Sequence, residues 1–454
     1  MNLGETSLPI PIFLAPMAGV TNAAYRRLCR EQAELGCEQR PAGVFTCEMI
    51  TARGITERID KTFAMMAPDV EDPIYSVQLY GTDPLVVGKA ISIACGEYGV
   101  SHIDLNFGCP VPKVTRRGGG GVLPWKLDRF AAILHAAVRA AEPFRVPVTI
   151  KTRIGIDNEH LTMFDAGRIA EQAGIAGITL HARTVDQAYS GKARWEAIAE
   201  LVQDVSIPVI GNGDIWEASD AVRMMAETGC AGVSIGRGVL GRPWLFRDLA
   251  SALSAGSYAL PGSIDRLPGV LHSASSAQDD GVDSFPESID RLPGVSPPHK
   301  VSSLRCGTLR GPRVLPGGRM TTGVEFGGEP RGNLPSCGEV AVMVRRHAEL
   351  LVIHFGDERH AMADLRKHMA WYFKGFSLGG ELRYALGLVS SLAELDDILA
   401  RLDLDEEFPE KELHSPRGRQ GSPRTKVAMP YNWLTSRTLD NFDLTGADLD
   451  TSGG

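Results

Sequence analysis

A regular alternation of short apolar runs and helical patterns, between residues 12 and 253, is the feature that most constrains the fold. Eight runs have the length and composition of β-strands, namely Ile12–Ala15, Gly43–Thr46, Ile74–Leu79, His102–Asn106, Val148–Thr152, Gly177–His181, Val209–Gly211 and Gly232–Ile235. Helical length and periodicity mark the segments Ala23–Gln32, Pro84–Tyr98, Asp128–Glu142, Met163–Gly174, Trp195–Asp204 and Trp216–Thr228. Eight βα units in roughly 240 residues have the size and rhythm of a TIM (β/α)8 barrel, an α/β fold. The alternative is a doubly wound open sheet, but such a sheet usually carries a GxGxxG turn after its first strand, and Ala15–Val20 lacks that pattern.

A sharp change of composition separates this barrel, residues 1–255, from the rest of the chain. Residues 256–334 are rich in Gly, Pro, Ser and Arg, lack periodicity, and carry the same octapeptide, Ser-Ile-Asp-Arg-Leu-Pro-Gly-Val, at 263–270 and 288–295. Because such a segment buries too little apolar surface to offset its ordering entropy, we expect a disordered insertion. Four further patterns, over residues 335–405, predict a small all-helical bundle: Val340–Phe355, Asp357–Gly375, Gly379–Val389 and Leu392–Leu402. Residues 406–454 predict a mostly irregular, basic C-terminal tail.

Charge and cysteine usage limit the function classes. The net charge of −8 argues against a uniformly basic nucleic-acid binder, but it does not exclude local basic patches. Two segments concentrate basic residues, the second helix of the bundle and the tail: Arg359, His360, Arg366, Lys367, His368 and Lys374, and then Arg417, Arg419, Arg424 and Lys426. We expect them to form a surface that follows nucleic-acid phosphates. The eight cysteines show no CxxC pair, no run approaches 18 apolar residues, and the N-terminus does not resemble a signal peptide, so we expect a cytoplasmic protein without a metal site or a membrane anchor.

Cys109 is the candidate for the chemistry. His102–Asn106 alternates polar and apolar residues like a strand, and Gly108 and Pro110 prevent the strand from continuing. The thiol is therefore expected on a turn at the carboxyl end of a strand, where a barrel carries its active site. The alternative is that Cys109 is a small buried apolar residue, as free cysteines often are.

Other polar residues fall at the same ends of the expected strands. Gln78, Lys151 and His181 each lie at the carboxyl end of a run, and such side chains are rarely buried without a partner. Two glycine turns follow the last two strands, Gly211–Asp214 and Ile235–Gly238, and each precedes a helix. Because glycine lets backbone N–H groups approach an anion, and because Arg237 adds a charged donor, we expect a phosphate-bearing ligand there.

These motifs carry a resemblance to the tRNA-dihydrouridine synthases, and most of all to the bacterial B-type. The matching stretches are Leu14–Asn22, Val77–Leu79, Asp104–Pro110, His181–Thr184, Gly211–Ile215 and Ile235–Gly238. The resemblance covers residues 3–254 and resumes from about 335, through His368–Phe376, to Tyr431–Leu434. The segment at 256–334 departs from the family pattern, which passes almost directly from the barrel to the helical domain.

The resemblance implies an FMN-dependent oxidoreductase that uses NADPH or NADH as reductant. It implies that the flavin lies over the barrel mouth and contacts Pro16, Met17, Ala18, Gln78, Lys151, His181, Asn212, Gly213, Asp214, Gly236 and Arg237. Lys151 would stabilise the reduced ring, and the two glycine turns would hold the ribityl chain and phosphate.

The resemblance also implies the substrate, specific uridines in tRNA, which are reduced to 5,6-dihydrouridine by a hydride at C6 and a proton at C5. A thiol is mostly protonated at neutral pH, which favours Cys109 as the general acid. Asn106 would contact the uracil edge, and Arg183 would grip tRNA phosphates together with the basic helical domain. We expect a monomer. Two alternatives stay open: an FMN-dependent barrel reductase of a free pyrimidine or an enone, and an inactive tRNA-binding relic.

Overall fold

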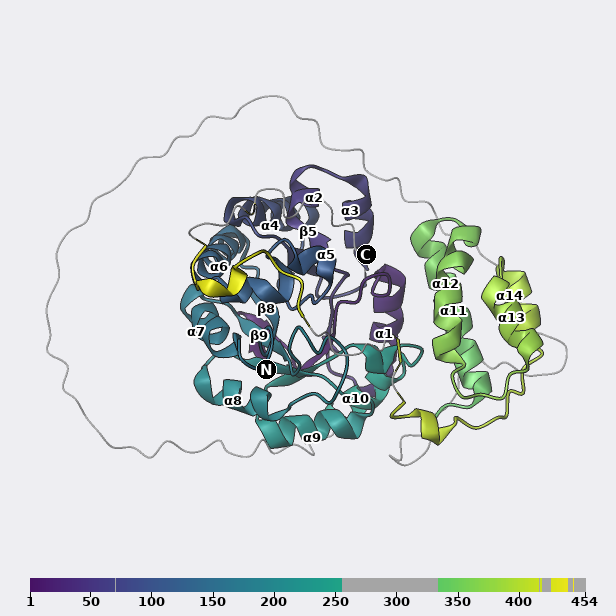
Figure 1. Ribbon diagram of the computed structural model, residues 1–454. Coiled ribbons are helices and arrows are strands. Elements are labelled where there is room, and N and C mark those ends of the chain that lie inside the picture. The colour runs from purple at the N-terminus through teal and green to yellow at the C-terminus, as the bar shows by residue number, and fades with distance from the viewer. Residues whose placement is uncertain (70, 255–333, 416, 419–425, 440–443, 445–454) are drawn as a thin grey trace, which may run out of the picture. The chain divides into compact units, whose positions relative to one another are not determined.

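The computed structural model describes residues 1–69, 71–254, 334–415, 417–418, 426–439 and 444, and Figure 1 shows their helices and strands. These residues belong to one compact unit. The expected insertion at 256–334 lies almost wholly outside the described residues and stays a prediction, and so do Arg419 and Arg424 of the expected basic tail. Within the described ranges, no helix combines the length and the apolar character that crossing a membrane requires.

A nine-stranded parallel sheet forms the centre of the N-terminal part, and it confirms the expected barrel. In chain order its strands are β3 (Ile12–Leu14), β4 (Val44–Phe45), β5 (Ile50–Thr51), β6 (Ser76–Tyr80), β7 (His102–Phe107), β8 (Val148–Arg153), β9 (Gly177–His181), β10 (Val209–Asn212) and β11 (Gly232–Ile235). Neighbours pair in the order β4-β3-β11-β10-β9-β8-β7-β6-β5, and all eight expected strands are present. The strands are buried almost throughout, as expected for a sheet that helices cover on the outside.

The barrel closes within its second strand, which the structure divides into two pieces. β4 pairs with β3 at one end of the sheet and β5 pairs with β6 at the other, although both belong to residues 44–51. Between them the Cys47 N–H donates to the Ser76 carbonyl at 3.2 Å, and the Ser76 and Thr46 hydroxyls are 2.9 Å apart. The sequence predicted a strand only over Gly43–Thr46 here, and it did not predict β5. It also gave no sign of the two-residue hairpin strands β1 (Asn2–Leu3) and β2 (Thr6–Ser7), which are too short to show periodicity.

Helices surround the barrel strands (Figure 1). The longer ones are α1 (Ala23–Gly36), α4 (Pro84–Tyr98), α6 (Leu127–Ala141), α7 (Met163–Ala173), α8 (Glu196–Asp204), α9 (Ala218–Thr228) and α10 (Leu245–Ser254). Short turns of helix are α2 (Ala52–Thr56), α3 (Asp60–Met66), α5 (Pro112–Thr115), η1 (Gly120–Trp125), η2 (Glu142–Phe144) and η3 (Arg237–Val239). Local signals explain where they begin and end. In α4, the Asp83 carboxylate accepts from the first free N–H groups, Pro84 occupies the first turn, and Gly99 ends the helix at φ +69°.

The C-terminal helices form the expected bundle, with α11 (Cys337–Phe355), α12 (Glu358–Tyr372), α13 (Gly380–Leu388) and α14 (Leu392–Leu399). This bundle packs on α1 of the barrel. The Arg346 guanidinium donates to the Glu31 carboxylate at 2.6 Å, and the Tyr25 ring lies 5.3 Å from the His347 ring and 5.5 Å from the His368 ring. Ion pairs and buried rings therefore both join the two parts.

Two expected phosphate-binding residues are instead part of this interior, and for them the prediction was wrong. His368 is fully buried against Tyr25. Arg417 is 1% exposed and donates to the Trp371 carbonyl. A side chain without exposed surface cannot follow the phosphates of a large RNA. Composition alone did not reveal this burial, because some of the residues that contact both side chains, Tyr25 for His368 and Trp371 for Arg417, are distant in the sequence.

The barrel and bundle also meet backbone to backbone at Gly241. Its φ of +66° favours glycine, and a Cβ atom there would lie only 2.2 Å from the carbonyl carbon of Trp371. The Tyr25 hydroxyl, on α1, donates to the Val239 carbonyl at 2.6 Å and fixes the same loop from the other side. The end of α12 is thus held against the loop that follows β11.

Candidate active site

A cavity of about 420 Å³ lies at the carboxyl ends of the barrel strands. The structure brings all the site residues that the sequence predicted to its wall: Pro16, Met17, Ala18, Gln78, Asn106, Cys109, Lys151, His181, Arg183, Asn212, Gly213, Asp214, Gly236 and Arg237. Their roles remain predictions, but their convergence is a property of the fold. The volume is within the usual range for a small-molecule or cofactor site.

Cys109 stands on the turn that follows β7. The Asn106 side-chain oxygen accepts from the backbone N–H groups of Gly108 at 3.1 Å and Cys109 at 3.0 Å, which fixes the start of the turn. On its other side, the Gly121 N–H donates to the Cys109 carbonyl at 3.0 Å. The residue is partly exposed and lines the cavity, so the alternative of a fully buried packing cysteine is wrong.

Below this turn lies a buried chain of polar side chains. The Asn106 amide donates to the Gln78 oxygen at 2.8 Å, and the Gln78 amide donates to the Asp104 carboxylate at 2.7 Å. The Thr149 hydroxyl donates to the other oxygen of Asp104 at 2.7 Å, while burial raises the pKa of that carboxyl. Each amide keeps one N–H that these contacts do not use, and both residues line the cavity. Asn106 is therefore a support for the Cys109 turn with one donor left for a ligand.

Lys151 lies at the end of β8, beside the centre of the cavity. Its ammonium donates to the Asn212 side-chain oxygen at 2.7 Å, and the Asn212 amide donates in turn to the Ser234 carbonyl at 2.6 Å. Burial lowers the pKa of Lys151, and neighbouring Arg153 lowers it further. Burial and nearby cations also hold the pKa of His181 well below its usual value, so this imidazole is neutral at pH 7. The site thus presents a lysine whose charged form an anionic partner would stabilise. It also presents a neutral histidine.

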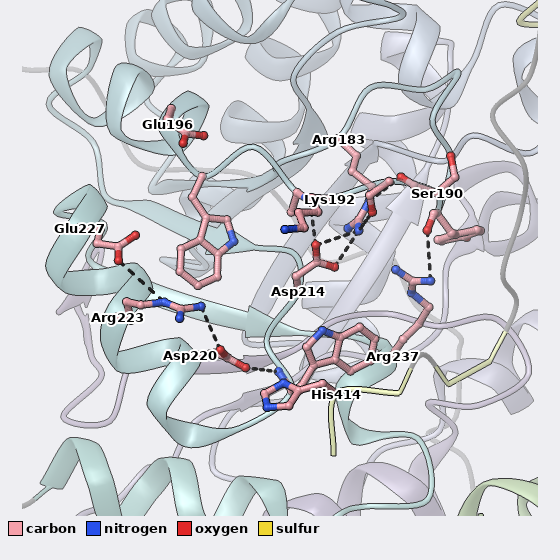
Figure 2. Close-up of a pocket in the computed structure, with 15 residues that line it drawn as sticks. Arg183, Ser190, Lys192, Glu196, Asp214, Asp220, Arg223, Glu227, Arg237 and His414 are labelled. Atoms are coloured by element: carbon pink, nitrogen blue, oxygen red, sulfur yellow. Dashed lines mark hydrogen bonds and ion pairs between the residues drawn. The ribbon is translucent and has the colours of Figure 1, made fainter. Parts of the chain in front are cut away.

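At one end the cavity is built to receive an anion. Arg183 is 2% exposed and donates through Nη2 to both oxygens of Asp214, at 2.7 and 2.9 Å (Figure 2). Its buried Nη1 has no hydrogen-bond partner among the described residues, a rare arrangement for a guanidinium. The expectation that Arg183 grips tRNA phosphates is not supported, because the side chain is enclosed. Asp214 is better described as the carboxylate that holds Arg183.

The glycine turns border this anion-receiving end. Gly213 has a φ of +131°, and a Cβ atom there would lie 2.8 Å from the Ala193 Cβ and 3.7 Å from Arg183 Nη1. Arg237 stacks over the Tyr189 ring at 5.1 Å, and burial lowers the pKa of its guanidinium. An uncompensated donor and an arginine with a depressed pKa both gain from a phosphate. The donor set therefore fits the phosphate end of a flavin mononucleotide.

Sequence comparisons identify the family. The family model described as "Dihydrouridine synthase (Dus)" matches residues 13–261. The chain belongs to the dihydrouridine synthase family. It is 45% identical to "Probable tRNA-dihydrouridine synthase" of Mycobacterium leprae, over 97% of this chain and all of that protein. It is 43% identical to the protein of the same description from Mycobacterium tuberculosis, over 100% of this chain and 97% of that protein. It is 37% identical to "tRNA-dihydrouridine synthase B" of Pseudomonas aeruginosa, over 60% of this chain and 78% of that protein.

Three further residues line the cavity that the sequence did not predict as site residues. Arg153, at the end of β8, is 3% exposed and donates to the carbonyls of Gly108, Thr184 and Ala188. Its position at a strand end was the signal that could have found it. Tyr189 lies beneath Arg237, within a stretch that looked like a loop. Trp371 reaches the cavity from the helical bundle, and no pattern within the barrel sequence points to it.

A second, wider depression of about 970 Å³ adjoins the anion-receiving end and shares Arg183, Asp214 and Arg237 with it (Figure 2). Several of its other charged side chains are already paired. Arg223 bridges Asp220 at 3.1 Å and Glu227 at 3.8 Å, and the His414 ring lies 2.6 Å from the Glu217 carboxylate. This pairing leaves the cavity near Cys109 as the better candidate for the chemistry. Among the described residues, no group of three or more His, Cys, Asp or Glu side chains forms a metal site.

Proposed function

We propose that the chain reduces specific uridines of tRNA to 5,6-dihydrouridine, with FMN in the cavity and NADPH or NADH as the source of electrons. The observation that carries the proposal is that one cavity combines Cys109 with the anion-receiving turns of Gly213, Gly236 and Arg237. Family membership supports the reaction, and the names of the relatives support tRNA as the substrate. When bound, the reduced flavin supplies the hydride that uracil takes up at C6.

The residues around the cavity would hold the flavin at three points. Arg183 and Arg237 would face its phosphate, since one has an unused buried donor and the other a pKa lowered by burial. Lys151 would lie against the electron-rich edge of the ring. Burial lowers the pKa of Lys151, and negative charge on the ring would raise it again. Gln78 would offer its remaining amide N–H to a ring carbonyl.

Cys109 would complete the reduction of the uracil C5=C6 bond. As hydride adds at C6, the two electrons of the π bond become available at C5, and the thiol gives its proton there. The cysteine is left as a thiolate and takes a proton back from solvent, so the protein is unchanged after turnover. Arg153 lies close enough to lower the energy of that thiolate, because its guanidinium binds the carbonyl of Gly108, the residue next to Cys109.

Exposed cations beside the cavity offer contacts for the tRNA backbone in place of Arg183. Lys113 and Arg116 are exposed and follow Cys109 within seven residues, on and after α5. The stacked uridine must leave the RNA to reach a thiol inside the cavity, and phosphate contacts at the rim would hold the strand while the base is turned out. In the bundle, Arg359 and His360 of α12 are also exposed.

The test separates the two half-reactions with Cys109→Ala. Flavin reduction by NADPH should stay within about twofold of the parental rate, whereas reoxidation by tRNA should slow by about 10²–10⁴, the usual contribution of a general acid. Both rates follow from flavin absorbance in a stopped-flow instrument. A parental rate of reoxidation would show that another group donates the proton. Free uridine serves as the control substrate, and turnover of it equal to that of tRNA would favour a reductase of small pyrimidines.

A further inference from the structure

The C-terminal segment, residues 426–439, crosses the barrel next to the turn that carries Cys109. Its central side chain, Trp433, is 1% exposed, and its indole N–H donates to the Val122 carbonyl at 3.0 Å. Trp433 also joins a small apolar cluster of its own, which is separate from the main core and contains Val122, Ile156, Val185, Val427 and Leu439. Ile156 and Val185 belong to the loops after β8 and β9, so the cluster ties the segment to three loops at the active-site end of the barrel.

Polar contacts fix the segment along its length. The Lys126 side chain is fully buried, and its ammonium donates to the Ser436 carbonyl at 2.8 Å and lies 4.9 Å from the centre of the Trp433 ring. The Arg437 guanidinium stacks 4.1 Å over the Trp125 ring and donates to the Trp125 carbonyl at 3.2 Å. A buried ammonium needs such partners, because an uncompensated charge in the interior is strongly unfavourable. The segment is thus an integral part of the barrel surface.

These contacts all converge on η1, the Gly120–Trp125 turn, which touches Cys109 directly. The Gly121 N–H binds the Cys109 carbonyl at 3.0 Å, and a Cβ atom at Gly120 would lie 2.6 Å from that carbonyl oxygen and 3.1 Å from the Cys109 Cβ. Gly121 adjoins Val122, whose carbonyl receives the Trp433 indole. Only two residues, Val122 and Gly121, therefore connect Trp433 to Cys109.

Trp433 covers one side of the turn, and the side chains of Tyr80, Val114 and Val185 lie against its glycines elsewhere. A Cβ atom at Gly118 would lie 2.6 Å from the Trp433 ring, so the indole rests on a glycine-rich backbone that has no side chains to fill the space. Without the indole, Val122 would lose an apolar neighbour and its carbonyl would lose its donor. Glycine-rich backbone is also the most free to move once its contacts are removed.

We propose that the C-terminal segment is a positioning element for the proton donor: Trp433 holds η1 against the Cys109 carbonyl and so fixes where the thiol points. The inference rests on the proposed role of Cys109 in protonating uracil at C5. Asn106 fixes the turn from inside the barrel, and Trp433 fixes it from outside. A displacement of about 1 Å in a reacting group costs on the order of a hundredfold in rate, so the outer contact matters for the proton transfer.

The experiment compares Trp433→Ala with Tyr431→Ala in the full chain with FMN bound. Tyr431 is 88% exposed on the same segment and serves as the matched control. For Trp433→Ala we expect reoxidation of the reduced flavin by tRNA to slow by roughly 10- to 100-fold, with flavin content and reduction by NADPH unchanged. In a Cys109→Ala background the same change should have no further effect, because the group that it positions is gone. Trp433→Phe keeps the ring and loses the N–H, so it should recover most of the rate.

Alkylation of Cys109 by iodoacetamide, followed by peptide mass spectrometry, supplies a readout that does not depend on the role of the thiol. Trp433→Ala should raise the rate of Cys109 alkylation severalfold, and Tyr431→Ala should leave that rate unchanged. If tRNA reoxidises the reduced flavin of Cys109→Ala at the parental rate, Cys109 is not the proton donor. The alkylation rates would still test whether Trp433 positions the thiol. The inference is overturned if Trp433→Ala slows both half-reactions equally or loses FMN, which would indicate general destabilisation, or if it changes neither rate. Should Trp433→Ala prove insoluble, Trp433→Phe must show the same selective slowing, to a smaller degree, for the inference to stand.

Discussion

Replacing Arg153 by Met removes the cation that joins the Cys109 turn to the loop after β9. Its guanidinium donates to the carbonyls of Gly108 at 2.8 Å and of Thr184 and Ala188 at 2.9 Å. Burial lowers the pKa of Arg153 to about 10, so the group is still charged at pH 7. A hydrogen bond from a charged group contributes about 1.5–3 kcal/mol, and a buried carbonyl left without a donor costs about 1–3 kcal/mol. Because Met restores part of the packing, and the three bonds are not independent, we expect a total loss of about 3–5 kcal/mol.

Urea unfolding followed by circular dichroism measures this loss, with the same excess of FMN in every sample because a bound cofactor adds to the apparent stability. Arg168→Met is the control. Arg168 makes one ion pair, to Asp204 at 2.6 Å, and its side chain is 57% exposed, so its loss should change the stability little. If Arg153→Met lowers the free energy of unfolding no further than Arg168→Met does, the three carbonyl contacts contribute little and the argument for a charged clamp fails.

Two further predictions concern the cofactor and pH. Arg237→Ala should weaken FMN binding by about 10- to 100-fold in a fluorescence titration, through loss of a charge-assisted contact, whereas Arg223→Ala should change it less than about twofold; equal affinities would place the phosphate elsewhere. Burial lowers the pKa of His102 to about 4 and that of His347 to about 3. Since the unfolded chain binds more protons below about pH 6.5, each neutral histidine should cost about 1 kcal/mol of stability per pH unit as the pH falls from there towards its folded pKa. His347→Gln should flatten the dependence of the urea midpoint on pH, and the same change at exposed His135 should not; parallel curves for the two variants would contradict this explanation.

The barrel and much of its site were predictable because both depend on local signals. Strand ends in a parallel barrel meet at one rim, so Gln78, Lys151 and His181 could be grouped without knowledge of any contact. Gly108 and Pro110, which follow β7, predicted the turn that carries Cys109. The short strand β5, Ile50–Thr51, escaped prediction because its pairing with β6 depends on how the sheet closes, which is a property of all the strands together.

The errors share one cause, which is that composition does not say which face of an element is covered. Arg183 was expected to reach RNA, but Asp214 and two backbone carbonyls enclose it. His368 was expected on a basic surface, but it packs on Tyr25 from another domain. Trp371 and Trp433 were passed over for the same reason: their partners lie more than 100 residues away in the sequence, at Gly241 and Val122.

The close approach of Gly241 to Trp371 limits how chimeras can be built from homologues of this protein. At this one contact main chain lies against main chain, so no side chain there can be trimmed or repacked to admit a foreign partner, and Trp371 itself lines the cavity. A chimera that takes its catalytic half from one homologue and its helical half from another must therefore reproduce the seam to within a fraction of an ångström. Chimeras that take residues 241–371 from one parent should keep this contact intact, because both of its sides then come from the same chain.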